Sequence, residues 1–83
     1  MYKIFILPQA KKDLNSLSDK IFSQIKNKIS SLSGNPRPSG CLKLTTEEDY
    51  RLRTGNYRIL YRIDDKEKTI YIYRIKYRKE AYR

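Results

Sequence analysis

The segment Tyr50–Ile63, with the sequence YRLRTGNYRILYRI, decides how this chain folds. Tyr50–Arg53 alternates between arginines and less polar side chains, and Tyr57–Ile63 also alternates, with Arg58, Leu60 and Arg62 on one face. Because successive side chains of a strand point to opposite faces, each run predicts a strand with arginines along one face. The residues between the two runs, Thr54–Asn56, predict a three-residue hairpin turn. The segment therefore predicts two antiparallel strands.

Further strands are expected on both sides of this hairpin. The polar run 64–68 (DDKEK) predicts a second turn, and Thr69–Lys76 predicts the last strand. Either of two alternating sets could face the core in that strand: Ile70 with Ile72, or Tyr71 with Tyr73 and Ile75. Upstream, Leu42–Leu44 predicts the start of a strand, and the polar residues 45–49 predict an exposed loop.

The N-terminal half predicts one strand and two helices. Residues 2–7 (YKIFIL) are rich in strand-forming side chains, and four consecutive apolar residues favour a strand that is central or covered on both faces. Pro8 suits the first position of a helix, and Ser18 suits the cap of a second. Apolar residues then recur three or four positions apart: Ala10, Leu14, Leu17, Ile21, Ile25, Ile29 and Leu32.

Together these elements predict a single domain, residues 1–83, of the α+β class. The expected order is β-α-α-β-β-β. Because both helices carry one apolar stripe, we expect a helical hairpin packed on one face of a small, mostly antiparallel sheet.

Positive charge dominates the composition, with a formal net charge of +10. Residues 50–83 contain eleven Lys and Arg against four Asp and Glu, together with seven of the eight tyrosines. Such a charge attracts polyanions, and its place on strands and turns argues against a membrane surface. No signal peptide or membrane span is predicted, so we expect a cytoplasmic protein.

Residue types that the sequence lacks exclude several kinds of chemistry. There is no histidine, which excludes histidine acid–base catalysis and the usual zinc sites. Cys41 is the only cysteine, and we interpret it as a small, partly buried side chain. No glycine-rich phosphate loop is present, and the acidic run 47–49 is typical of a solvated loop. We therefore expect no metal and no cofactor.

Arginine, lysine and tyrosine remain, and these side chains suit chemistry on RNA. RNA carries its own nucleophile, the 2′-hydroxyl, so a protein need supply only alignment, positive charge at the phosphate and proton transfer. By the period of two, Arg51 shares a face with Arg53, and Arg58 shares a face with Arg62. Whether all four share one face depends on the register, which stays open. The alternative is a cationic face that only keeps the sheet soluble.

The block Tyr50–Tyr61 resembles the core of the RelE/ParE superfamily, the toxins of type II toxin–antitoxin systems. The shared pattern is R-x-G-x-Y-R-x-x-Y over residues 53–61, followed by the acidic turn and the tail 77–83 (YRKEAYR). The helical hairpin and residues 35–37 (NPR) fit as well, so the resemblance covers nearly the whole chain. It implies a small toxin of one domain that a cognate antitoxin neutralises.

RelE-like members cut mRNA in the ribosomal A site and leave a 2′,3′-cyclic phosphate, and the resemblance implies that activity here. It implies catalytic roles for Arg58, Arg78 and Tyr82. Arg53 stands where some relatives have lysine; since arginine does not lose its proton, Tyr82 is the expected proton acceptor. The residues expected to bind RNA are Arg51, Arg53, Arg62, Lys43 and Lys76.

The resemblance also implies partners. We expect an acidic, RelB-like antitoxin that forms a hetero-oligomer with the toxin, the ribosome with its mRNA, and a monomeric free toxin. Two alternatives stay open because the pattern does not separate the branches of the superfamily. One is a ParE-type inhibitor of DNA gyrase, and the other is a non-toxic relative that binds antitoxin or RNA.

Overall fold

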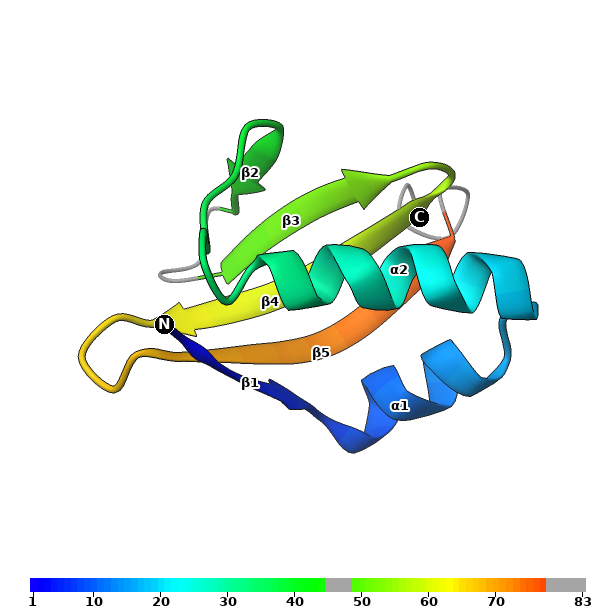
Figure 1. Ribbon diagram of the computed structural model, residues 1–83, viewed down its shortest axis with the longest axis horizontal. Coiled ribbons are helices and arrows are strands. Elements are labelled where there is room, and N and C mark those ends of the chain that lie inside the picture. The colour runs from blue at the N-terminus through cyan, green and yellow to red at the C-terminus, as the bar shows by residue number, and fades with distance from the viewer. Residues whose placement is uncertain (45–48, 78–83) are drawn as a thin grey trace.

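The computed structural model describes residues 1–44 and 49–77, which form a five-stranded sheet with two helices on one face (Figure 1). The order across the sheet is β1-β5-β4-β3-β2. The helices are α1 (Pro8–Asn15) and α2 (Asp19–Ser31). The strands are β1 (Lys3–Ile6), β2 (Cys41–Lys43), β3 (Asp49–Thr54), β4 (Tyr57–Asp64) and β5 (Thr69–Tyr77). The predicted α+β class is confirmed, and the strand expected to start at Leu42–Leu44 is the short separate strand β2, which makes four strands after the helices.

The β3–β4 hairpin is closed by a two-residue turn, which corrects the three-residue turn expected from the sequence. Thr54 pairs with Tyr57, so only Gly55 and Asn56 lie between the strands. Gly55 has a φ of 59°, in the left-handed region that glycine adopts without steric cost. A positive φ at the first turn position is typical of type II′ hairpins, whose twist matches that of the strands. The turn therefore fixes the register of the whole hairpin.

Strand β5 uses parts of both sets of residues that could have faced the core. A β-bulge at Tyr73 interrupts its pairing with β4. Because the extra residue reverses the alternation of side chains, Ile70, Ile72 and Ile75 all lie on the helix-facing side. All three are buried in the core.

The core lies between the sheet and the two helices. Its buried side chains come from both helices and from the inner faces of β3, β4 and β5: Ala10, Leu14, Ile25, Ile29, Leu32, Tyr50, Leu52, Ile59, Tyr61, Ile63, Ile70, Ile72 and Ile75. Tyr61 is fully buried, and its hydroxyl donates to the carbonyl oxygen of Pro36 at 2.8 Å. Its ring stacks on Tyr50 with a centroid distance of 5.8 Å. This pair fixes the loop after α2 against the sheet.

Strand β1 lies at an edge of the sheet, so the expectation of a central or doubly covered strand is wrong. It pairs in parallel with β5 and with no other described strand (Figure 1). Ile4 and Ile6 pack against the core, whereas Phe5 points to the opposite face and keeps 51% of its surface exposed. The Phe5 ring stacks on Tyr71 at 5.9 Å between centroids. The apolar run of β1 therefore contributes Ile4 and Ile6 to the core and Phe5 to a contact on the opposite face.

The helices begin where the sequence predicts. Pro8 is the first residue of α1, where the missing N–H of proline costs no hydrogen bond. The Ser18 hydroxyl caps α2 by accepting the N–H of Ile21 at 3.5 Å. No helix within residues 1–44 and 49–77 is long and apolar enough to cross a membrane.

A polar network holds the loop 34–40 against the turn between β4 and β5. Arg37 donates to Asp65 at 2.7 Å and to the Tyr50 hydroxyl at 3.0 Å, and the Tyr2 hydroxyl donates to Asp65 at 2.6 Å. The pKa of Asp65 is lowered, chiefly by its hydrogen bond with Arg37 and next by its hydrogen bond with Tyr2. The hydrogen bond with Asp65 also raises the pKa of Arg37. The network lies at the end of β4 opposite to the Gly55 turn, where it orders the scaffold.

Candidate functional site

Three cations lie side by side on the face of the sheet that the helices do not cover, which we call the open face. The register places Arg53 of β3 opposite Arg58 of β4, and Arg58 opposite Lys76 of β5. Residues opposite each other on neighbouring strands point to the same face, so these three side chains form one line across three strands. We call Arg53, Arg58 and Lys76 the cationic row. The structure thereby answers the open question of register: the arginines of both hairpin strands share one face.

The cationic row is unfavourable for folding when considered alone. Like charges directly opposite each other destabilise a sheet by up to about 1 kcal/mol per pair. The row holds two such pairs, one between β3 and β4 and one between β4 and β5. A sheet face that concentrates positive side chains in this way is suited to attract an anion.

The members of the cationic row differ in exposure. Arg58, in the centre, has only 1% of its surface exposed, whereas Arg53 is exposed and Lys76 is partly exposed. The expected contact between Arg58 and a phosphate therefore requires a rearrangement that exposes its guanidinium. In the described arrangement the accessible cations of the row are Arg53 and Lys76.

Two other predicted RNA-binding residues extend the open face along the strands. Arg51 lies two residues before Arg53 on β3 and is half-buried, with Leu60 opposite. Arg62 pairs with Asp49 across the strands, and its Nε donates to the Asp49 carboxylate at 3.0 Å. The Arg62 side chain keeps 54% of its surface exposed. The cation of Arg62 is therefore partly neutralised, and the net positive charge of this face lies toward the Gly55 turn.

Sequence reasoning missed the role of Arg74. Its register places it opposite Leu60, next to the row, but its Nε donates to the Asp13 carboxylate at 2.9 Å. The same carboxylate oxygen of Asp13 accepts the N–H of Ile75 at 2.9 Å. Asp13 thus joins α1 to β5 just beyond the residues of β5 that pair with β1, and its carboxylate forms an ion pair with Arg74. Residues so far apart in the chain leave no local pattern that predicts the contact.

The structure does not place the remaining predicted site residues in the cationic row. Lys43 pairs with Tyr50 on the short strand β2, so the register places it on the helix-facing side at the edge of the sheet. Arg78 and Tyr82 lie outside the described residues, and their catalytic roles stay predictions.

Two tyrosines near the sheet centre are poor proton acceptors. Burial raises the pKa of Tyr61 well above its ordinary value. Burial also raises the pKa of Tyr73, and the nearby Asp49 carboxylate adds to the rise. A phenol with a raised pKa stays protonated near neutral pH, so neither hydroxyl is suited to accept a proton from RNA.

The described residues contain no group of three or more His, Cys, Asp or Glu side chains that could hold a metal ion. Positive charge at this site comes from side chains, and the chemistry the described site offers is charge stabilisation of a phosphate by arginine and lysine.

Comparison with known proteins defines the class. Residues 4–82 match the family described as ParE toxin of type II toxin-antitoxin system, parDE. The match spans almost the entire chain, and the chain belongs to this toxin family.

Its relatives within the superfamily are RelE-like. Toxin RelG of Mycobacterium tuberculosis is 32% identical over 84 residues, which cover 99% of this chain and 97% of the relative. A chain of the RelBE2 toxin–antitoxin complex from the same organism superposes with a TM-score of 0.82 at 31% identity, covering 93% of this chain and 98% of that one. A chain of the RelE–RelB complex of Pyrococcus horikoshii gives a TM-score of 0.84 at 31% identity, covering 93% and 94%.

Proposed function

We propose that this chain is the toxin of a type II toxin–antitoxin pair and a ribosome-dependent endoribonuclease that cuts mRNA in the A site. The observation that carries the proposal is the cationic row of Arg53, Arg58 and Lys76 on the open face of a RelE-like fold. Cleavage at the ribosome stops translation and places the activity in the cytoplasm. No metal or cofactor is required, because the substrate supplies the nucleophile.

The reaction is an in-line displacement at phosphorus. The 2′-oxygen loses its proton and attacks the adjacent phosphorus, the bond from phosphorus to the 5′-oxygen breaks, and that oxygen takes up a proton. The products are a 2′,3′-cyclic phosphate and a 5′-hydroxyl. Negative charge builds up on the non-bridging oxygens in the transition state, and each well-placed donor there contributes about 3–4 kcal/mol.

The proposed roles follow from position and exposure. Arg53 and Lys76, at the ends of the cationic row, contact the phosphate first. Arg58 contributes its charge from the centre of the row and clamps the scissile phosphate once its guanidinium is exposed. Arg78 neutralises the leaving oxygen and Tyr82 accepts the proton; both assignments rest on the resemblance.

We also propose a cognate antitoxin of the RelB type as partner. One of the similar chains comes from a complex named as a toxin–antitoxin complex, RelBE2, and another comes from a complex of RelE with RelB. A protein with a net charge of +10 favours an acidic partner, which would neutralise it within a hetero-oligomer. The free toxin is expected to be a monomer. Light scattering of the toxin alone and with the product of the adjacent reading frame tests both statements.

The test of the reaction uses purified ribosomes that carry a defined codon in the A site. Primer extension should stop within that codon when the toxin is added, and the downstream fragment should accept a phosphate from polynucleotide kinase directly, as a 5′-hydroxyl does. The same mRNA without ribosomes should stay intact. Intact mRNA on ribosomes in the presence of folded toxin would contradict the proposal.

The family description names ParE toxins, so a gyrase assay is the matched alternative. The proposal expects DNA supercoiling by gyrase to continue at saturating toxin. Inhibited supercoiling together with intact mRNA would instead identify a ParE-type activity. A toxin that affects neither process and does not arrest growth would be a non-toxic relative.

A further inference from the structure

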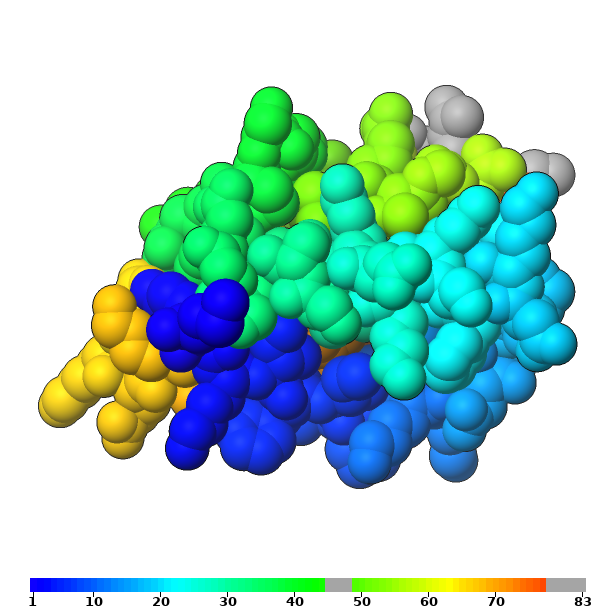
Figure 2. All heavy atoms as spheres, viewed as in Figure 1, coloured from blue at the N-terminus to red at the C-terminus, as the bar shows by residue number. Residues whose placement is uncertain are grey.

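The outer edge of the sheet beside β3 contains a cavity of about 400 Å³. Strand β2 pairs with Tyr50, Arg51 and Leu52 only, so among the described strands none covers β3 beyond Leu52. Figure 2 shows the resulting notch in the outline, between the green atoms of β2 and the yellow-green atoms near the end of β3. The cavity is lined by Lys28, Ser39, Gly40, Leu42, Arg51, Leu52, Arg53 and Gly55.

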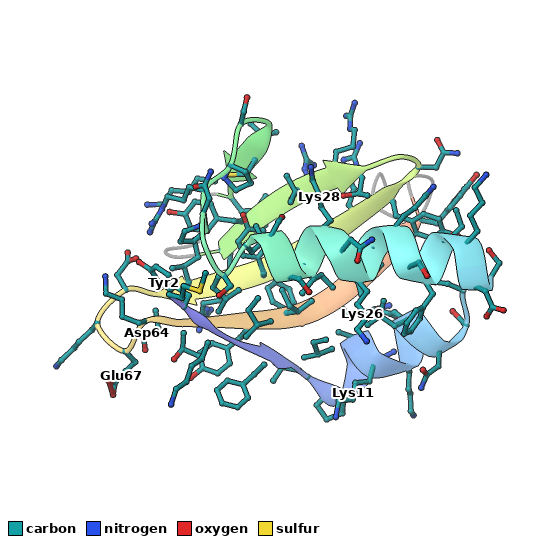
Figure 3. The ribbon with its side chains drawn as sticks, viewed as in Figure 1. Tyr2, Lys11, Lys26, Lys28, Asp64 and Glu67 are labelled. Atoms are coloured by element: carbon teal, nitrogen blue, oxygen red, sulfur yellow. The ribbon has the colours of Figure 1, made fainter. Side chains whose placement is uncertain are left out.

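Three cations from both layers of the fold meet at this edge cavity. Arg51 and Arg53 come from β3, and Lys28 comes from α2. In Figure 3 Lys28 lies on the side of α2 next to β3, whereas Lys26 lies on the side of α1. Lys28 follows the buried residue Ile25 by three positions, so it flanks the core-facing stripe and is exposed. The described lining contains no acidic side chain, so the local charge is positive.

The backbone adds a donor to the same place. The N–H of Leu44 donates to the carbonyl oxygen of Asp49 at 2.8 Å, which shows that Asp49 directs its backbone groups toward the β2 edge. The backbone N–H and C=O groups of successive strand residues point alternately to the two sides of the strand. Those of Arg51 and Arg53 therefore point to the same edge as those of Asp49. Arg53 lies one residue beyond the end of the β2 pairing. Its N–H therefore points toward the edge cavity.

We propose that the edge cavity binds a phosphate group of the RNA strand, next to the phosphate held at the cationic row. This inference rests on the proposed function, because it assumes that RNA crosses the open face. Arg53 belongs both to the row and to the cavity, so it links the cations of the row on β4 and β5 to Lys28 on α2. Neighbouring strands lie about 4.8 Å apart, so the part of this path from β5 across β4 to β3 is about 10 Å long. Lys28 acts as a binding residue, remote from the reacting atoms.

The test compares Lys28→Gln with Lys26→Gln, which makes the same charge change on the same helix. Binding is measured by fluorescence anisotropy with a labelled single-stranded RNA whose 2′-oxygens are methylated, so that no cleavage occurs. One lost phosphate contact reduces the slope of log K against log salt concentration by about 0.7, which is about a fivefold weaker affinity at 0.1 M salt. Lys28→Gln should show both changes, and Lys26→Gln should match the wild type. On programmed ribosomes, Lys28→Gln should raise the half-saturating toxin concentration and leave the maximal cleavage rate unchanged.

Several results would overturn the inference. If Lys28→Gln and Lys26→Gln bind RNA equally while the wild type cleaves mRNA, the edge cavity is not a phosphate site and the proposed function stands. If Lys28→Gln weakens antitoxin binding alone, the cavity is a protein interface. If the folded wild type neither binds the methylated RNA nor cleaves on ribosomes, both proposals fail. Unchanged thermal unfolding of Lys28→Gln, expected for an exposed side chain, verifies that the comparison reports binding.

Discussion

Replacing Arg53 by glutamine is expected to stabilise the fold while it weakens RNA cleavage. Arg53 faces Arg58 directly across the hairpin and lies two residues from Arg51 on the same face. A directly opposed like-charge pair costs up to about 1 kcal/mol. Since the Arg53 side chain is exposed, solvent and salt screen part of this repulsion, and we expect a gain of about 0.5 kcal/mol at low salt.

The gain is measurable by thermal unfolding. For a domain of this size, 1 kcal/mol corresponds to about 4–8 °C, so Arg53→Gln should raise Tm by about 2–4 °C in low salt. The increase should disappear in 1 M salt, where charges are screened over about 3 Å. Circular dichroism at both salt concentrations gives the comparison directly.

Arg62→Gln is the matched control, because it removes one positive charge from the same face. Arg62 is bonded to Asp49 at 3.0 Å, so its loss should lower Tm or leave it unchanged, by at most about 1 kcal/mol. Opposite signs for the two variants would show that position in the row, and not total charge, sets the effect. If Arg53→Gln lowers Tm in low salt as Arg62→Gln does, the reasoning about the cationic row is refuted.

Three further predictions concern the scaffold. Asp13→Asn should destabilise the fold by about 1–3 kcal/mol in chemical denaturation, because it weakens the contacts with Arg74 and with the N–H of Ile75. Burial alone would raise the pKa of Asp13, but these hydrogen bonds and the charge of Arg74 lower it overall. The stability that Asp13 contributes should therefore be present above pH about 4 and be lost as the pH falls through the folded pKa of Asp13. Asp13→Asn should not show this loss of stability. Ser18→Ala should cost about 0.5–1 kcal/mol through the lost helix cap, with an unchanged urea m-value. Tyr61→Phe should cost about 1 kcal/mol and increase hydrogen exchange in the loop 34–40, and unchanged exchange there would contradict the anchoring role of its hydroxyl.

The hairpin segment shows what alternation alone can predict. The period of two identified β3 and β4 and the arginines on each, because every side chain alternates faces. It could not tell whether Arg53 and Arg58 meet, since that depends on a turn of two residues in place of three. Likewise, the bulge at Tyr73 reverses the alternation within β5, and no local pattern marks the position of the extra residue.

Contacts between distant segments explain the other differences. The sequence of β1 suggested a strand covered on both faces, but its parallel partner β5 is set by topology, which leaves Phe5 on a surface. The engagement of Arg74 by Asp13 depends on where α1 lies against the sheet. The burial of Arg58 was not expected either, because alternation assigns a face and says nothing of what that face contacts. Charge and motif predicted a site for phosphate, which stays a prediction, and the packing determines which of its cations are accessible.

The most direct test of the central claim is single-turnover cleavage of mRNA on ribosomes with a defined codon in the A site, by the wild type and by Lys76→Gln. Lys76 is a partly exposed member of the cationic row, opposite Arg58. The wild type should cut within the A-site codon and leave a 2′,3′-cyclic phosphate. Loss of one charge donor at the phosphate should slow Lys76→Gln by about 10²–10³-fold with its fold intact. Equal rates for the two proteins, or no cleavage by folded wild type, would contradict the claim that the cationic row cleaves RNA.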